Sequence, residues 1–335
     1  MKTQNLLLSL FLFSSVSFAS GQDITPKEPR WKQLSQAFGF ICGQQASLEL
    51  IGKKFPELDK DVKQSWFAFN SCALGESVKG VEAELSTELG EKWPETKEKL
   101  ATQMTDTVGK QEFTKEQASA FLADVKLRSK GELPEPIRAA LLSAHPRFTK
   151  NPALEITEGW KQTFRTKDHP KAKGVDFSIS FPASWSKREG NRPNIIQFFQ
   201  SNAGHGPIMC SIMVKPLPLP AGTILSKEDL KDFFQPNELK DMVSEGETLV
   251  DAKSIVLEGS PAGMIVSDVT KQRMDITLTT RKTQFVTIQG TSMIFIQFMI
   301  ARMPDSKDSL DDLQKQHLPT YRVIANSFVY NDKYK

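Results

Sequence analysis

The spacing of apolar residues changes once along the chain, near Gly159, and this change most constrains the fold. Before it, apolar residues recur every three or four positions, which is the period of one face of a helix. After it, they alternate with polar residues, as Phe177, Ile179 and Phe181 do, which is the period of a half-buried strand. The 335 residues are enough for two domains. We therefore expect an α-helical N-terminal bundle followed by an α+β C-terminal domain.

Prolines and a capping motif mark the ends of the helices expected in the first half. Helical spacing begins at Trp31 and continues to about Lys54, and Pro56 disfavours a helical conformation for the residue before it. Thr114 and Gln117 have the Thr-x-x-Gln spacing of a capping box, which predicts a helix start at that point. The expected helices are 31–54, 56–73, 94–108, one that opens at 114, and 136–144.

The first twenty residues have the three parts of a secretory signal peptide. A basic start at Lys2 is followed by the apolar run 6–16 and by small residues up to Ala19 and Ser20. The run is about half the roughly 20 residues that a membrane-spanning helix requires, and later apolar runs have the length of strands. We expect cleavage near Ala19 or Ser20, no transmembrane segment, and a mature protein that is periplasmic or secreted.

Two cysteines lie at equal distances from the break between the first two expected helices. The midpoint of Cys42 and Cys72 is residue 57, and residues equally far from the turn of a helical hairpin lie at the same height. Export favours oxidised cysteines, so we expect a disulfide that closes a loop of about 30 residues and contributes about 3–4 kcal/mol. The alternative is two free buried thiols, which pack as small apolar side chains.

The second half has the pattern of an antiparallel sheet with helices packed on it. A helix at 226–243, interrupted by Pro236, separates the early strands from the late ones, and a last helix at 310–328 contains a break at Pro319. The expected strands are 176–181, 193–200, 208–215, 254–257, 263–269, 274–278, 286–288 and 291–302.

The order of these features resembles that of PsbP-like domains over roughly residues 160–330. The resemblance starts in the segment 175–185, where an alternating strand meets Pro182 and then Trp185. It continues through the middle helix and the segment 258–263, and it ends in the terminal helix and the segment 324–328. It implies an α/β/α sandwich, in which an antiparallel sheet is flanked by helices. The better-known members of that family are binding proteins, but no binding residue carries over to this chain.

These patterns predict four segments. They are a signal peptide at 1–20, an α-helical domain at 28–150, a linker at 151–172 and the PsbP-like domain at 173–330.

Local motifs for catalysis or metal binding are not evident in the sequence. Local metal sites place histidines and cysteines about two to five residues apart, and they need three or four ligands. Among the four histidines only His205 lies that close to another histidine or a cysteine, namely Cys210, and no third such residue lies near this pair. Ser184 and Lys187 have the Ser-x-x-Lys spacing of penicillin-binding enzymes, but the serine follows a strand and the companion motifs are missing. We predict no catalytic residue, no metal site and no cofactor. The net charge of +3 and the export signal also argue against a nucleic-acid partner.

Tryptophans and basic residues around the start of the second domain are the weak candidates for ligand binding. Trp160 and Trp185 could stack on a ligand between the domains, and Arg188 and Arg192 could attract an anionic partner. A solvated surface is the simpler interpretation of the basic residues. The leading hypothesis is an exported, non-enzymatic binding protein whose partner is a protein or an envelope ligand. The alternatives are an envelope hydrolase whose site is assembled from distant residues, and a small-molecule-binding protein.

The signal-peptide hypothesis predicts where the mature chain begins. Production of the full-length chain in a Gram-negative host should give a periplasmic protein that starts within one or two residues of Ser20, because the signal peptidase cleaves after small residues. Cell fractionation and intact-mass measurement check this result. A cytosolic product that retains residues 1–20 would contradict it.

Overall fold

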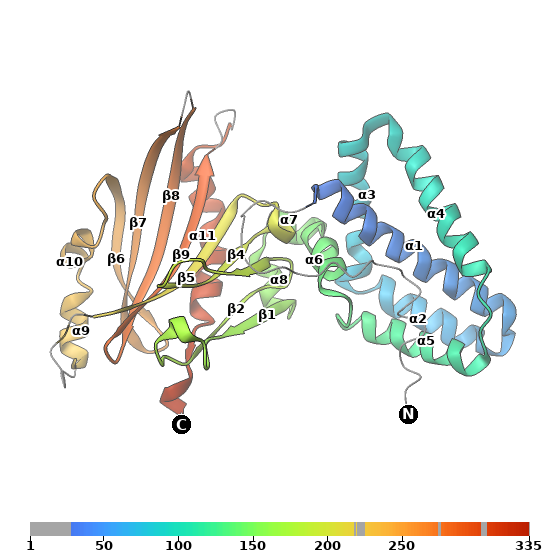
Figure 1. Ribbon diagram of the computed structural model, residues 1–335, viewed down its shortest axis with the longest axis horizontal. Coiled ribbons are helices and arrows are strands. Elements are labelled where there is room, and N and C mark those ends of the chain that lie inside the picture. The colour runs from blue at the N-terminus through green and yellow to red at the C-terminus, as the bar shows by residue number, and fades with distance from the viewer. Residues whose placement is uncertain (1–27, 218, 220–224, 274–275, 303–306, 335) are drawn as a thin grey trace. The chain divides into compact units, whose positions relative to one another are not determined.

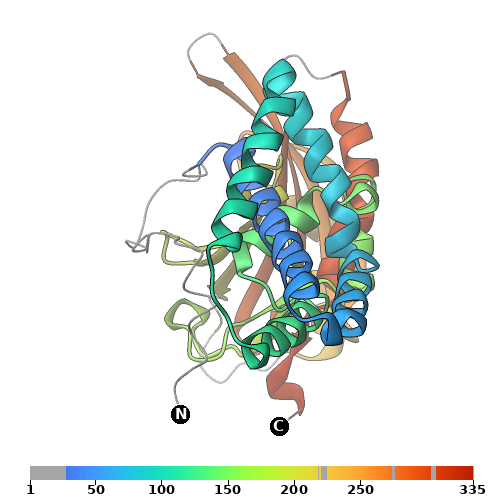
Figure 2. The same ribbon diagram turned by 90° about the vertical axis from the view of Figure 1, so that its right-hand side faces the viewer.

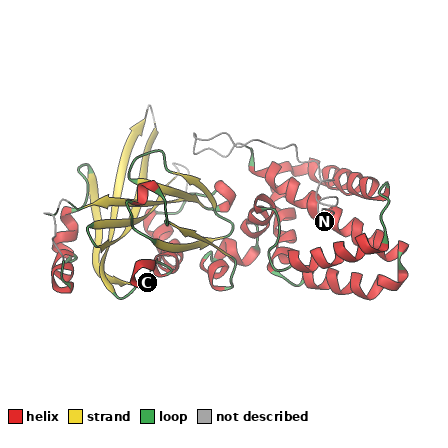
Figure 3. Ribbon diagram, turned by 60° about the horizontal axis from the view of Figure 1, so that its bottom comes forward, coloured by secondary structure: helices red, strands yellow, loops and turns green. Residues whose placement is uncertain are grey.

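The computed structural model describes residues 28–217, 219, 225–273, 276–302 and 307–334. The expected signal peptide, residues 1–20 with its cleavage site at Ala19 or Ser20, lies outside the described residues. The chain divides after Pro146 into two compact units, which we call the helical unit and the sheet unit. Strands occur only in the sheet unit of the described chain (Figure 3). This organisation confirms the expected fold class, an N-terminal helical region followed by an antiparallel-sheet domain with helices.

The helical unit is built around its first helix (Figures 1 and 2). The buried face of that helix carries Leu34, Phe38, Leu48 and Ile51 at helical spacing, and it packs against α3, α4 and α6. The helices are α1 (Arg30–Lys54), α2 (Asp59–Asn70), α3 (Ala73–Leu89), α4 (Trp93–Gly109), α5 (Lys115–Arg128) and α6 (Glu135–Ser143).

The structure has a helix at Ala73–Leu89 that the sequence did not predict, because the expected helix at 56–73 was followed by none before residue 94. The helix α2 ends at Asn70, and α3 begins only three residues later at Ala73. This tight junction requires Gly75, since a Cβ atom at that position would lie 2.3 Å from the carbonyl oxygen of Phe69.

The junction also explains why the expected disulfide is not formed. Cys42 and Cys72 are both free thiols. Cys72 lies in the turn between α2 and α3, where its Sγ donates a hydrogen bond of 3.1 Å to the carbonyl oxygen of Phe69. Cys42 lies on α1 and is close enough to Glu82 and Lys97, on α3 and α4, to feel their charges. Partial burial raises the pKa of both thiols.

The described residues of the sheet unit form two antiparallel sheets, although the sequence predicted one. The smaller sheet has the order β1-β2-β10, and the larger has the order β3-β4-β5-β9-β8-β7-β6 (Figure 1). The strands are β1 (Lys161–Arg165), β2 (Phe177–Pro182), β3 (Ser186–Glu189), β4 (Ile195–Gln200), β5 (Ile208–Pro216), β6 (Glu247–Leu257), β7 (Ser260–Arg273), β8 (Ile276–Gln289), β9 (Ser292–Arg302) and β10 (Val329–Tyr330).

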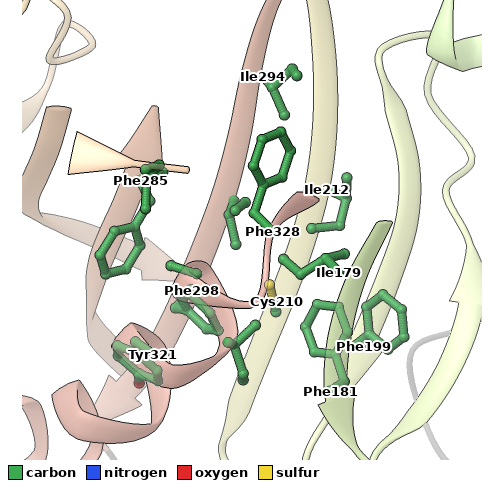
Figure 4. Close-up of a cluster of buried hydrophobic side chains, with 14 of the residues drawn as sticks. Ile179, Phe181, Phe199, Cys210, Ile212, Phe285, Ile294, Phe298, Tyr321 and Phe328 are labelled. Carbon is green, nitrogen blue, oxygen red and sulfur yellow. The ribbon is translucent and has the colours of Figure 1, made fainter. Parts of the chain in front are cut away.

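Helices pack on both faces of the larger sheet. One face, together with the smaller sheet and α11 (Leu310–Asn326), encloses the main core, in which the rings of Phe298 and Tyr321 stack with centroids 4.2 Å apart (Figure 4). The other face contacts α9 (Lys227–Phe233) and α10 (Pro236–Asp241). The expected break at Pro319 is not present: α11 continues through it, and the proline lies on the exposed side of the helix.

The stretch 151–172, which the sequence suggested as a linker, contains secondary structure that belongs to the sheet unit. It holds α8 (Ala153–Thr157) and β1, and a short helix α7 (Pro146–Lys150) precedes it. Alternate residues of β1 are partly buried, namely Gln162 and Phe164, and the strand pairs along its whole length with β2. Its period-two pattern is only five residues long, and its basic residues obscured it in the sequence.

Two helical glycines provide a matched test of packing in the helical unit. A Cβ atom at Gly80 would lie 1.8 Å from the backbone oxygen of Ala144, whereas a Cβ atom at Gly39 would meet nothing within 4 Å. Gly80→Ala should lower the free energy of unfolding of the unit by about 1–3 kcal/mol because α3 must move away from the end of α6. Gly39→Ala should raise it by up to about 1 kcal/mol because alanine favours the helix.

Urea denaturation of the mature protein, followed by far-UV circular dichroism, measures both changes. Equal effects of the two substitutions would show that the close approach of Gly80 to Ala144 is not a packing constraint.

Candidate functional site

A pocket of about 310 Å³ lies in the sheet unit between an edge strand of each sheet, β1 and β3. We call it the edge pocket. Its walls combine two aromatic rings with basic, acidic and amide side chains. The lining residues are Gln162, Thr163, Phe164, Lys187, Arg188, Glu189, Gln197 and Phe199.

Two aromatic rings supply the apolar surface of the edge pocket. The rings of Phe164 on β1 and Phe199 on β4 meet edge to face, with centroids 5.8 Å apart. Phe199 also stacks on Phe181 of β2 at 3.7 Å, well inside the core (Figure 4). The apolar surface of the pocket is therefore continuous with the core and is held in place by it.

The strand β3 brings charged side chains of both signs to the edge pocket. Lys187 and Glu189 stand opposite the lining residues Phe199 and Gln197. The side chain of Arg188 points to the other face of β3, where its guanidinium group lies over the ring of Phe198, 4.3 Å from its centroid. The carboxylate of Glu189 forms an ion pair with Lys171 at 2.8 Å, and this hydrogen bond lowers the pKa of Glu189. Glu189 therefore stays ionised at neutral pH, and the pocket presents a mixed-charge wall.

Gln162 joins the β1 side of the edge pocket to the turn before β3. Its Nε2 donates hydrogen bonds to the carbonyl oxygens of Pro182 at 3.0 Å and Trp185 at 2.5 Å. Thr163 points to the opposite face of the sheet, where its hydroxyl lies 3.1 Å from that of Ser180. The hydrogen bonds of Gln162 hold β1 beside the turn that leads into β3, although β1 and β3 belong to different sheets.

A buried carboxyl group holds the same turn from the side of α8. Glu155, only 2% exposed, accepts hydrogen bonds from the backbone N–H of Ser184 at 2.6 Å and from its hydroxyl at 2.7 Å. Burial raises the pKa of Glu155 to about 8 and outweighs the hydrogen bonds from Ser184 and Ala183, which lower it. This pair was missed in the sequence because its members lie 29 positions apart and match no motif.

The structure brings only one of the four predicted ligand-binding residues to the edge pocket. Arg188 lines it, and Arg192 is exposed in the connection between β3 and β4. Trp160 is half-buried just before β1. Trp185 is 2% exposed and packs against Phe181 with ring centroids 6.0 Å apart, so its indole ring belongs to the core. Packing in the core therefore accounts for the tryptophan that follows the strand and Pro182 in segment 175–185.

The described residues contain no cluster of three or more His, Cys, Asp or Glu side chains arranged to hold a metal ion. Within the same residues, no helix has both the length and the apolar character needed to cross a membrane. His317 of α11 packs in the core beside Tyr321, and burial lowers its pKa. The edge pocket is thus the cavity on which we base a binding site.

Comparisons with known proteins found similarity to solved structures only. No family model and no curated protein matches the chain. The chain is similar to cyanobacterial PsbP (CyanoP) from Synechocystis sp. PCC 6803, with 13% identity and a TM-score of 0.30 over 51% of this chain and 92% of that one. PsbP is the family that residues 160–330 resemble in sequence.

Two further solved structures are similar to the chain. One is LpqN, involved in cell envelope biogenesis of Mycobacterium tuberculosis, with 13% identity and a TM-score of 0.31 over 52% of this chain and 93% of that one. The other is a protein from Bacteroides thetaiotaomicron VPI-5482, with 13% identity and a TM-score of 0.29. That match covers 48% of this chain, which spans only 46% of the Bacteroides protein.

The raised pKa of Glu155 predicts a pH-dependent stability. The folded state holds the proton more tightly than the unfolded state, whose pKa is near the ordinary 4.5. Protonated Glu155 therefore makes its full contribution to the free energy of unfolding below about pH 4.5. This contribution is lost as the pH rises to about 8, by at most about 1.4 kcal/mol per pH unit. Glu155→Gln removes the titrating group while it keeps an oxygen acceptor for Ser184.

Urea denaturation of the wild type and of Glu155→Gln between pH 5 and 8.5 measures this effect. The difference in their free energies of unfolding should shift in favour of the variant as the pH rises. Parallel curves for the two proteins would contradict the assignment.

Proposed function

We propose that this chain is an exported binding protein of the bacterial envelope and that the edge pocket receives its ligand. The proposal of export rests on the basic start, short apolar run and small residues of segment 1–20. The proposal of binding rests on the edge pocket, which is the single observation that carries it.

The composition of the edge pocket suits recognition of a molecule that has both an apolar and a polar part. The rings of Phe164 and Phe199 give it a rigid apolar surface, and Lys187 and Glu189 give it charges of both signs. Binding pockets typically combine an apolar lining with a few polar groups that orient the ligand. The apolar part of the ligand would contact the rings, and its polar groups would face the β3 wall.

The polar groups of the edge pocket are arranged for holding a ligand rather than for proton transfer. General acid–base catalysis at neutral pH requires a group whose pKa lies near 7. The carboxylate of Glu189 is instead paired with Lys171, which lowers its pKa further. The amide of Gln162 donates to two backbone carbonyls and so supports the wall. We therefore propose binding without catalysis.

The walls of the edge pocket are also fixed before any ligand arrives. Gln162 connects β1 to the turn before β3, and the buried pair of Glu155 and Ser184 anchors that turn to α8. Phe199 is held by its stack on Phe181. A binding site that is already ordered loses less conformational entropy when the ligand binds, which favours affinity.

Site-specific photo-crosslinking in living cells tests the proposed function. A photoreactive amino acid at Lys187, which lines the edge pocket, should give a discrete crosslinked product in the envelope. The same amino acid at Lys231, an exposed lysine on α9, should not give it. Phe164→Ala combined with the probe at Lys187 should lower the yield about fivefold or more, because it removes an aromatic anchor.

Electrophoresis with mass spectrometry identifies the products. The proposal is wrong if the probe at Lys187 gives no product, or if both positions give the same products.

A further inference from the structure

We propose that the ligand of the edge pocket is an extended peptide segment, which pairs as an additional strand with β1. This inference rests on the proposed function and gives it a ligand class. It follows from how the strands border the pocket, from their hydrogen-bonding register and from the size of the pocket.

Each edge strand contributes three consecutive residues to the lining of the pocket. These are Gln162, Thr163 and Phe164 from β1, and 187–189 from β3. Successive side chains of a strand point to opposite faces of its sheet. The side chains of Thr163 and Arg188 contact Ser180 and Phe198, which do not line the pocket, so these two residues border it with their backbone. The pocket therefore reaches the backbone of both edge strands.

The register of β1 shows which backbone groups face this edge. Among the described strands, β1 pairs with β2 alone. Hydrogen bonds join Ala183 N–H to the oxygen of Trp160 at 3.1 Å, and Thr166 N–H to the oxygen of Phe177 at 2.9 Å. Since bonded residues alternate along an antiparallel ladder, the even-numbered residues of β1 bond to β2. The backbone N–H and C=O groups of Thr163 therefore point away from β2.

The register of β3 leads to the same result on the other side of the pocket. This strand pairs with β4 alone among the described strands. The N–H of Gly190 bonds to the oxygen of Ile196 at 3.1 Å, so Arg188 is the next residue that bonds to β4. The backbone groups of Glu189 consequently point away from β4. Two strand edges with outward-pointing backbone groups thus border one pocket.

An extended peptide matches this arrangement better than a compact small molecule does. Along β1, the outward-pointing backbone groups repeat at every second residue, or about every 7 Å, which is the repeat of a pairing strand. The rings of Phe164 and Phe199 would contact an apolar side chain of the peptide. A pocket of about 310 Å³ lies at the lower end of the range for small-molecule sites, which suits one side chain of a longer segment.

A phage-displayed library of random peptides, selected on the purified mature protein, supplies the probes. Recovered peptides are synthesised with a methyl group on one backbone nitrogen at a time, and their affinities are measured by calorimetry. Methylation at every second position should weaken binding about tenfold, because it removes a backbone hydrogen bond, and the positions between should change little. An irregular pattern, or no recovered peptide, overturns the proposal.

A matched pair of protein variants tests the same point from the side of β1. Thr163→Pro removes the outward N–H donor, and it is compatible with an edge strand because that N–H makes no bond to β2. Thr163→Val also loses the hydroxyl but keeps the N–H. Thr163→Pro should weaken peptide binding about tenfold, and Thr163→Val should leave it within about twofold of wild type.

Circular dichroism establishes whether the variants are folded, and the methylation series decides the matter if Thr163→Pro is not. Equal affinity of folded Thr163→Pro and Thr163→Val contradicts pairing with β1. Self-association of the protein that Thr163→Pro abolishes, with no peptide bound, would mean that a second copy occupies the edge, and this too overturns the proposal. Crosslinking at Lys187 to a non-peptide molecule would leave the proposed function intact while it excludes the peptide.

Discussion

The stack of Phe181 on Phe199, with ring centroids 3.7 Å apart, is the contact on which the architecture of the sheet unit depends. The two rings come from β2 and β4, so their contact joins the smaller sheet to the larger one at the side where both sheets end in an edge strand. The stack holds the sheets face to face, but β1 and β3 are not paired with each other. The edge pocket is the space that remains between them. The wall of the candidate site is therefore continuous with the packing of the core.

The turn between β2 and β3 transmits this arrangement to the pocket. It must leave one sheet and enter the other within three residues, and backbone groups in such a turn need partners. Glu155 supplies them from α8, and Gln162 supplies them from β1. A buried carboxyl group with no cationic partner within the described contacts is costly when ionised, which explains why its pKa is raised to about 8. The folded state is therefore favoured when Glu155 is neutral, because desolvation outweighs the hydrogen bonds from Ser184 that favour the ionised form.

The sequence predicted those parts of the fold that depend on local signals. The capping box at Thr114 starts α5, and the change from helical to alternating spacing separates the two units. The sequence-based predictions were wrong where a contact between residues far apart in the chain determines the local structure. No local signal shows that Gly75 allows α3 to turn back tightly after α2, so Cys72 was placed within a helix and paired with Cys42. The division of the ten described strands into two sheets likewise depends on contacts that alternation does not encode.

The candidate site was mostly beyond sequence analysis for a related reason. A pocket made by strand edges is lined by runs of consecutive residues, whereas sequence patterns identify residues that share a face. Arg188 was chosen for its charge, and it does line the pocket, but Thr163 carries no chemical signal at all. Thr163 matters because of its position in the ladder. The even-numbered residues of β1 bond to β2, so this odd-numbered residue directs its backbone groups away from β2. Which residues of β1 point their backbone groups outward follows from the register of its pairing with β2. Strand pairing, rather than side-chain chemistry, therefore determines which hydrogen-bonding groups this edge presents to a ligand.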